Sequence, residues 1–268
     1  MARHRALEMF GRSGNPAFKS KAFSHRSSDF STKEVMTLSG AVNKTGLYLL
    51  LCVLSASWTW NIFFNSGDPS SVSGLMIFGL IGGFIAAMVT IFKPTVANIS
   101  APIYALLQGL AIGGISAMYE SAFDGIVMQA LALTFGTLAA LLLAYKSGLI
   151  KPTENFRLML FAATGGIFVL YLVSFVMSFF GSSIGFIHSN SLMGIGFSLV
   201  VVAVAALNLV LDFDFIEQAA EQGAPKYLEA YGAFSLMVTL IWLYLEILRL
   251  LSKLYSRNEW DPIFFTQY

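Results

Sequence analysis

Residues 205–227 read AALNLVLDFDFIEQAAEQGAPKY, and the interpretation of the whole chain starts from this stretch. Its first half is apolar except for Asn208, and acidic residues follow: Asp212, Asp214, Glu217 and Glu221. Gly223 and Pro225 then interrupt the pattern before a last apolar segment. A carboxylate at the end of a membrane-spanning helix is costly to desolvate and therefore marks a candidate functional site. We expect Asp212 to be functional and the other three acids to form a solvated turn.

The composition is that of a lipid-embedded protein. The chain has 268 residues, of which 56% are hydrophobic and 12% charged, and its mean hydropathy is +0.71. A soluble domain typically has about 25% charged residues. A net charge of +1 argues against nucleic-acid binding. The single cysteine, Cys52, excludes an internal disulfide or a cysteine-based metal site.

Seven apolar segments are close to the length of about 20 residues that a spanning helix needs. They are Gly46–Phe64, Leu75–Phe92, Ile99–Tyr119, Gly125–Tyr145, Phe156–Phe180, Leu192–Leu211 and Tyr227–Leu254. The sequence therefore predicts an all-α, polytopic integral membrane protein with seven transmembrane helices. Its expected parts are a polar, basic arm (1–44), the transmembrane domain (45–255) and a short tail (256–268).

Basic residues occur in alternate connections. Residues 65–74, 120–124 and 181–191 contain no lysine or arginine, whereas the other connections carry Lys93, Lys146, Lys151, Arg157 and Lys226. Because basic loops favour the cytoplasmic side, we expect a cytoplasmic N-terminal arm and a multi-pass protein of the cell inner (plasma) membrane. Asp212 then lies at the cytoplasmic mouth. Seven spans place the C-terminus outside in spite of its basic residues Arg249, Lys253 and Arg257, and the alternative is that the last segment does not fully cross.

Three stretches resemble the Bax inhibitor family, also called the transmembrane Bax-inhibitor-motif proteins. The first is the third-helix segment 104–110, YALLQGL, with Gly113. The second is the end of the sixth helix, 208–212, and the third is the acidic stretch 212–227. The resemblance covers roughly residues 42–253, and the residues of the acidic stretch are similar to those of a bacterial branch of the family.

The resemblance implies seven helices with the last one central, and a pH-sensitive calcium leak channel. In that family two aspartates, one on each of the last two helices, form the pH-responsive latch. Asp212 matches the first of them. The second position falls near Ala233 and Met237, which cannot ionise, and Gln108 stands where the family often has a glutamate.

Candidate ligands for a hard cation can be named from the residues themselves. Calcium takes about 6–8 oxygen ligands, and the candidates are Asp212, Asp214, Asn208 and Gln108. With so few carboxylates we expect only weak, transient Ca²⁺ binding at Asp212, and no bound cofactor. Glu229, near the start of the seventh helix, is the expected partner of Asp212 at a similar depth.

Glu246 has two interpretations. Arg249 follows at i+3 on the same helical face, which favours an intrahelical ion pair. Alternatively, Glu246 is a second carboxylate on the ion path, because ionisable residues within a membrane mark such paths.

Three functions remain open. The first is a pH-sensitive calcium leak whose partners are lipid, Ca²⁺ and protons. The second is a proton-coupled secondary transporter that uses the same carboxylate. The third is a non-conducting modulator of membrane proteases or other membrane-protein partners. An enzyme is not expected: the segment 181–185, GSSIG, matches G-x-S-x-G, but a hydrolase needs that motif between a strand and a helix.

Overall fold

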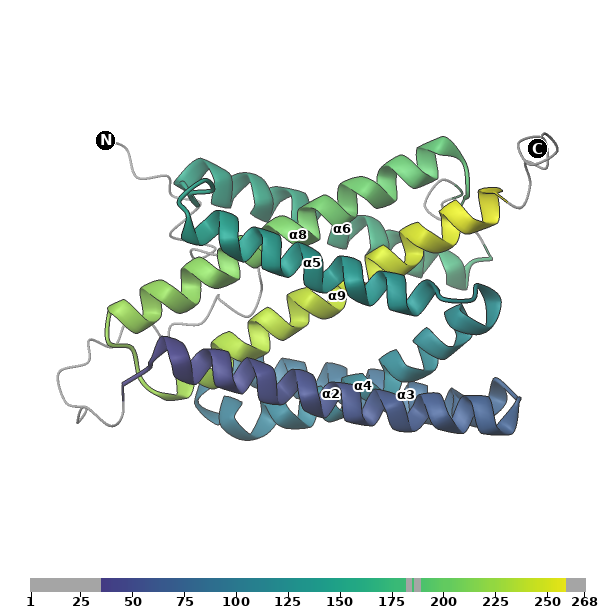
Figure 1. Cartoon of the computed structure of the whole chain (residues 1–268), viewed down its shortest axis with the longest axis horizontal. Helices are drawn as coiled ribbons and strands as arrows, with labels where there is room; N and C mark the ends of the chain where they lie inside the picture. Colours follow the sequence, from purple (N-terminus) through teal and green to yellow (C-terminus); the bar gives the residue numbers. More distant parts are fainter. Residues whose placement is uncertain (1–34, 182–184, 186–188, 259–268) are drawn as a thin grey trace. The chain divides into compact units, whose positions relative to one another are not determined.

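The structure is a computed structural model that describes residues 35–181, 185 and 189–258. Seven long α-helices occupy most of these residues: α2 (Leu38–Ser66), α3 (Ser70–Phe92), α4 (Ala97–Ala122), α5 (Ile126–Lys146), α6 (Glu154–Phe179), α8 (Leu192–Glu221) and α9 (Tyr227–Asn258) (Figure 1). A short 3₁₀ helix, η4 (Pro94–Val96), leads into α4. All seven long helices are long and apolar enough to cross a membrane. The predicted all-α, seven-helix fold is confirmed.

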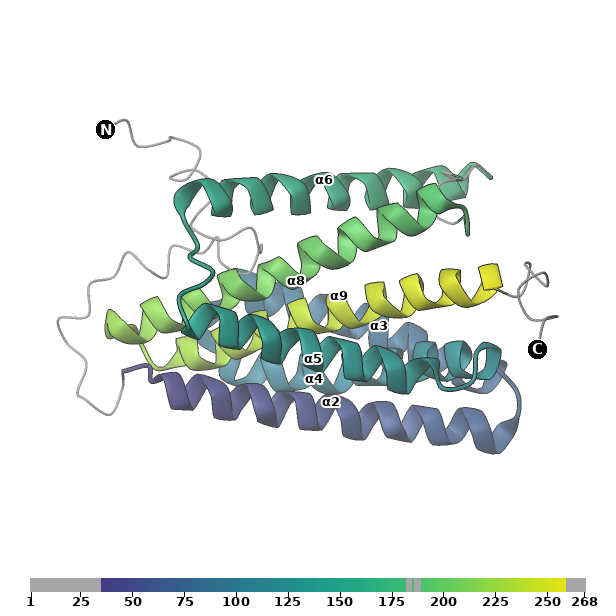
Figure 2. The same ribbon diagram turned by 45° about the horizontal axis from the view of Figure 1, so that its top comes forward.

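α2 and α8 extend furthest beyond their predicted apolar segments. α2 begins at Leu38 because the Thr37 side chain accepts a hydrogen bond from the Gly40 amide and caps the helix. α8 continues past Leu211 to Glu221, so the predicted acidic turn is wrong and the acids belong to the last turns of this helix. A short connection with Gly223 at φ 64° then leads into α9 (Figure 2). Glycine adopts this left-handed conformation without steric cost, so the helix ends there.

The described helices form two compact units. Unit 1 consists of the residues up to Met118 together with 210–238, and unit 2 consists of 119–209 and the residues from Thr239 onward. α2 and α3 belong to unit 1, and α5 and α6 to unit 2. α4, α8 and α9 contribute residues to both units.

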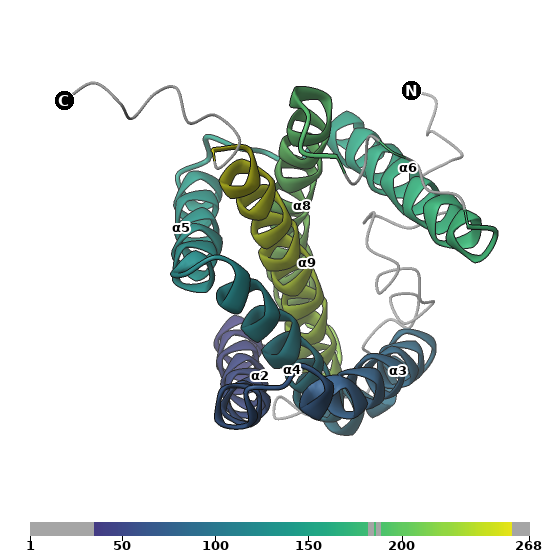
Figure 3. The same ribbon diagram turned by 90° about the vertical axis from the view of Figure 1, so that its right-hand side faces the viewer.

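Glycines bring the helices of unit 1 close together. α4 lies between α2 and α3 (Figure 3). A Cβ on Gly109 would lie 2.3 Å from the carbonyl oxygen of Cys52 in α2, and one on Gly79 of α3 would lie 2.5 Å from that of Leu107 in α4. Small residues permit this close approach, which supplies packing where lipid offers no hydrophobic driving force.

α9 is the most buried of the seven spans, since 67% of its apolar stretch is buried. In unit 1, Phe234 packs edge-on against Tyr104 of α4 at 5.0 Å between ring centroids. In unit 2, Tyr255 accepts a hydrogen bond of 2.6 Å from Gln129 of α5. Within each unit α9 therefore packs against other helices, and its central position among all seven stays a prediction.

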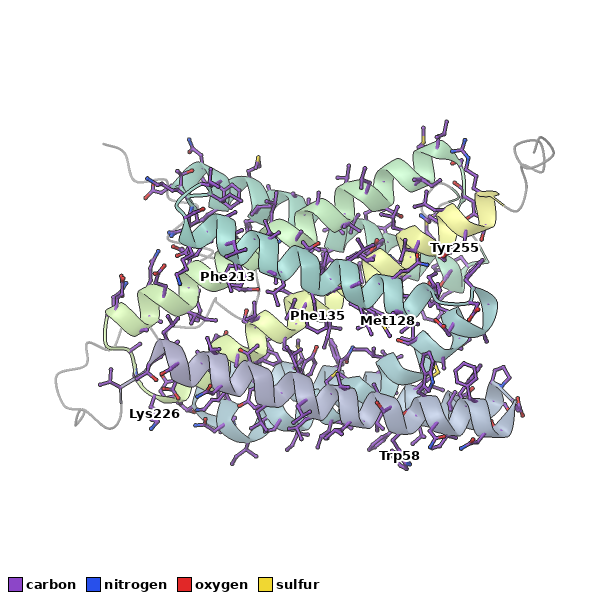
Figure 4. The ribbon with its side chains drawn as sticks, viewed as in Figure 1. Trp58, Met128, Phe135, Phe213, Lys226 and Tyr255 are labelled. Carbon is purple, nitrogen blue, oxygen red and sulfur yellow. The ribbon has the colours of Figure 1, made fainter. Side chains whose placement is uncertain are left out.

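The outward faces are apolar. In α2, α3, α5 and α6 no more than 22% of the apolar stretch is buried. Trp58 and Met128 are examples of large side chains that point outward (Figure 4). Soluble proteins rarely expose continuous apolar surface of this kind. Together with the seven apolar helices, these faces identify a multi-pass membrane protein.

Candidate functional site

Asp212 is buried inside unit 1. Its side chain is 1% exposed, on the part of α8 that belongs to this unit. The Ser235 hydroxyl of α9 donates a hydrogen bond of 3.0 Å to Oδ1 of Asp212. A buried carboxylate needs such donors, because removing its charge from water without them costs on the order of several kcal/mol. Asp212 thereby links the last two helices.

A hydroxyl, not a carboxylate, faces Asp212 from α9. Ala233 and Met237 flank Ser235, and all three residues are completely buried. Serine can donate or accept a hydrogen bond, but its hydroxyl does not ionise near neutral pH. The contact between Asp212 and Ser235 therefore contains one titratable group.

Glu229 belongs to a different cluster. Its carboxylate, 3% exposed, accepts hydrogen bonds from the Thr37 amide (3.0 Å) and the Thr37 hydroxyl (2.9 Å). The Lys44 ammonium lies 3.3 Å from Oε2 and donates to Asn98 at 2.8 Å. Glu229 precedes Ser235 by six residues, which is about 9 Å along a helix. The prediction that Glu229 lies at the depth of Asp212 is therefore wrong.

This Glu229 cluster ties the residues before α2 to the start of α9. Val35 forms an antiparallel bridge with Pro225, and the Met36 amide donates to the Ala224 carbonyl at 2.7 Å. Sequence reasoning missed both this attachment and Lys44. No local pattern could have indicated it, because Thr37 and Glu229 are separated by 192 positions.

The other predicted cation ligands have separate neighbours. Asp214 is half-buried and accepts a hydrogen bond from Gln218 of its own helix at 2.7 Å. Asn208 donates to Thr164 of α6 at 2.9 Å and to its own helix. Gln108 lies against Gly83 of α3. Within the described residues no group of three or more histidine, cysteine or acidic side chains could hold a metal ion.

Glu246 forms the predicted pair with Arg249, at 2.9 Å, within unit 2. The structure adds Tyr171 of α6, whose hydroxyl donates to Glu246 at 3.1 Å and accepts from Arg249 at 2.7 Å. The Arg249 guanidinium also lies 5.2 Å from the centre of the Tyr171 ring. The intrahelical pair is confirmed, and the sequence gave no signal for its tyrosine partner.

Two further predictions fall outside the described residues. The G-x-S-x-G segment includes residues 182–184, and the polar arm and the tail include 1–34 and 259–268.

Neither the search of curated proteins nor that of solved structures gave a match. A family model described as Bax inhibitor 1 like matches residues 15–256, which is most of the chain. It includes all seven spans almost to the end of α9, and the buried aspartate that links the last two helices. The chain belongs to the Bax inhibitor 1 like family of membrane proteins.

Proposed function

We propose that this protein is a pH-sensitive leak channel for cations, Ca²⁺ among them, with Asp212 as its pH sensor. The observation that carries the proposal is the buried Asp212 carboxylate within a membrane span, bonded to Ser235 of the neighbouring helix. Ionisable residues inside membrane spans are rare, and they mark ion paths and proton relays. Membership of the Bax inhibitor 1 like family also supports a channel function.

The sensor acts through the hydrogen bond between Ser235 of α9 and Asp212 of α8. When Asp212 is ionised, Ser235 donates to a carboxylate, and such charge-assisted bonds are about twice as strong as neutral ones. Protonation removes the charge and leaves a weaker, neutral bond. The two protonation states therefore differ in how firmly the two helices are held together, and this difference biases the channel between closed and open states.

Calcium meets few ligands in this arrangement. The contact between Asp212 and Ser235 supplies one carboxylate and one hydroxyl, which on their own are fewer than the 6–8 oxygens of a tight calcium site. A conducting path requires binding weak enough for the ion to leave. The donor set therefore fits a permeating cation that keeps most of its water ligands, with Asp212 as a transient contact.

We also propose which ends of the helices face the cytoplasm. Lysine and arginine in alternate connections favour a cytoplasmic N-terminus in the cell inner membrane. The α8–α9 connection and Lys226 then face the cytoplasm, and Asp212 lies about two and a half helical turns before the end of α8 at Glu221.

Flux measured from liposomes containing the purified full-length chain tests this function. The wild type should release Ca²⁺ passively, with a rate that changes with pH. Asp212→Asn keeps the shape of the side chain and removes its titration, so the rate should vary less than about twofold over the pH range in which the wild type varies tenfold or more. Ser235→Ala is the matched control: it should shift the pH midpoint and leave the response in place, because Asp212 still titrates.

The outcome also separates the alternatives. A proton-coupled transporter would show saturable, substrate-dependent proton uptake, and a non-conducting modulator would show no flux at all. Circular dichroism and thermal unfolding establish that each variant is folded. Unchanged pH-dependent flux in folded Asp212→Asn protein would refute the role of this residue as sensor.

A further inference from the structure

A short segment before α2 covers the end of unit 1 at which α8 ends and α9 begins. We call this segment, Val35, Met36 and Thr37, the strap. Val35 forms an antiparallel bridge with Pro225, and the Met36 amide donates to the Ala224 carbonyl at 2.7 Å. Met36 is 2% exposed, whereas Val35 is half-buried and Thr37 is exposed. The strap therefore turns the Met36 side chain inward.

The Met36 side chain reaches the contact between α8 and α9. Its terminal carbon, Cε, lies 3.8 Å from the position that a Cβ on Gly232 of α9 would take, and Cγ1 of Ile216 of α8 lies 2.9 Å from the same position. Gly232 and Ile216 are both buried. Glycine at this position therefore leaves room for two side chains from other segments. Methionine suits such a place, because its unbranched side chain adapts to irregular gaps.

This contact lies about one helical turn from Asp212. Gly232 precedes Ser235 by three residues and Ile216 follows Asp212 by four, and both spacings keep residues on one face of a helix. Both offsets run toward the connection between α8 and α9, by about 4.5 and 6 Å along the two helices. All of these residues belong to unit 1. Met36 therefore lies next to the contact between Asp212 and Ser235, on the side of that connection.

The Glu229 cluster holds the strap in this position. Glu229 precedes Gly232 by three residues and so continues the same face of α9. Its carboxylate accepts hydrogen bonds from the amide and the hydroxyl of Thr37, at 3.0 and 2.9 Å, and leaves no room for a Cβ on Gly40. The carboxylate thus occupies the N-terminal turn of α2, where the helix dipole favours a negative charge. Met36 is consequently fixed by its neighbour Thr37 as well as by its own amide.

We infer that the strap is a gate for the proposed leak, in which Met36 closes the path to Asp212 from the α8–α9 connection. The inference rests on the proposed function, because it needs Asp212 to lie on a conducting path, and it adds to that path an apolar control point. With the strap in place, the side chains of Met36 and Ile216 keep water and ions away from Asp212, since apolar constrictions close pores by excluding water. Conduction then requires the strap to leave its position.

A disulfide that fixes the strap tests this gate. Val35 and Pro225 are opposite one another, and the hydrogen bond beside them joins Met36 to Ala224. In such a non-hydrogen-bonded antiparallel pair the Cα atoms are about 4.5 Å apart, within the range of about 4.4–6.8 Å that a disulfide spans. Val35→Cys and Pro225→Cys together, in a Cys52→Ala background, should therefore form a disulfide on oxidation, detected as the loss of thiols that react with maleimide.

Passive Ca²⁺ efflux is then measured from proteoliposomes of this full-length double variant, oxidised and reduced, at equal protein-to-lipid ratio. The oxidised protein should conduct at least about fivefold more slowly than the same protein after reduction, because the strap cannot leave its position. The matched control is the Val35→Cys single variant in the same Cys52→Ala background. Its lone thiol cannot close the bridge, so the same oxidation and reduction should change its efflux by less than about twofold.

Replacing Met36 tests the side chain that closes the path. Met36→Ala removes most of the apolar side chain and keeps the backbone bonds of the strap, so it should raise Ca²⁺ efflux by about threefold or more. Met36→Leu keeps an apolar side chain of similar volume and should stay within about twofold of the wild type. Circular dichroism and thermal unfolding establish that each compared protein is folded.

Three outcomes overturn the inference. A folded double variant that forms no disulfide would show that the strap does not lie on the α8–α9 connection as described. Equal efflux from the oxidised and reduced protein, or from Met36→Ala and Met36→Leu, would show that the strap is only a structural anchor, while the proposed leak would stand. No efflux from any folded protein, the wild type and Met36→Ala included, would overturn the proposed function and this inference with it.

Discussion

Replacing Gly109 by alanine tests whether the close approach of α2 and α4 holds unit 1 together. A Cβ at this position would lie 1.9 Å from the Ser55 hydroxyl oxygen and 2.3 Å from the Cys52 carbonyl oxygen. The first contact involves a side chain that can turn away. The second involves the backbone of α2, so it is relieved only when one helix moves.

The geometry gives the size of the effect. Ordinary contact begins at 3.4 Å, so the distance to the Cys52 carbonyl must grow by 3.4 − 2.3 = 1.1 Å. Overpacking of this kind typically costs about 1–3 kcal/mol. Alanine regains about 0.5–1 kcal/mol over glycine within a helix. The net expectation for Gly109→Ala is a loss of up to about 2.5 kcal/mol, with a central value of about 1.3 kcal/mol, or a fall in Tm of about 3–5 °C at that central value for a chain of this size.

Gly46 provides the matched control. It lies in α2 of the same unit, and a Cβ added there would meet nothing within 4 Å. Gly46→Ala should therefore leave Tm unchanged or raise it slightly, because only the helix preference of alanine acts.

The measurement is thermal unfolding of both variants and the wild type in the same detergent, followed by circular dichroism and by the retention of a monodisperse peak after heating. A Gly109→Ala protein as stable as Gly46→Ala would show that α2 and α4 do not pack as closely as described. The reasoning about glycine-mediated contact in unit 1 would then be wrong.

The other predictions concern the Glu229 cluster and the orientation. Glu229→Gln removes a buried charge that pairs with Lys44; because that lysine is partly exposed, we expect the free energy of unfolding to fall by about 1–3 kcal/mol, less than the full cost of breaking a buried pair. The control Glu221→Gln, at an exposed site of α8, should change it by no more than about 0.5 kcal/mol in the same thermal unfolding experiments. Equal losses in the two variants would contradict a stabilising role of the Glu229 cluster. For the orientation, a cysteine replacing Ser70 in a Cys52→Ala background should react with an impermeant thiol reagent added outside intact cells, whereas one replacing Ser147 should not. Labelling of the second alone would reverse the proposed topology.

The sequence by itself determined the class of the protein and the number of its helices. Seven apolar segments among so few charges leave little alternative to a helical membrane protein, because only helices and closed barrels satisfy every backbone hydrogen bond in lipid. The start of α9 at Tyr227 was also readable, since Gly223 and Pro225 end one helix pattern and permit the next. The pair of Glu246 and Arg249 was predictable because it depends on spacing within one helix.

The sequence failed where polar residues continue a helix beyond its apolar part. Hydropathy ended the sixth helix at Leu211, but backbone hydrogen bonding carries α8 to Glu221. Hydrophobicity locates the part of a helix that lipid covers, and it does not report where the helix itself stops. The same reason explains why α2 begins before its apolar segment, at the Thr37 cap.

Only the tertiary structure decided which polar groups meet. Ser235 faces Asp212, Thr37 and Lys44 surround Glu229, and Tyr171 completes the pair at Arg249. Each contact joins residues distant in sequence, and the partners are set by how helix faces pack. Periodicity within a single helix contains no information about the face of another helix opposite it, so composition and spacing could identify these charged groups but not pair them.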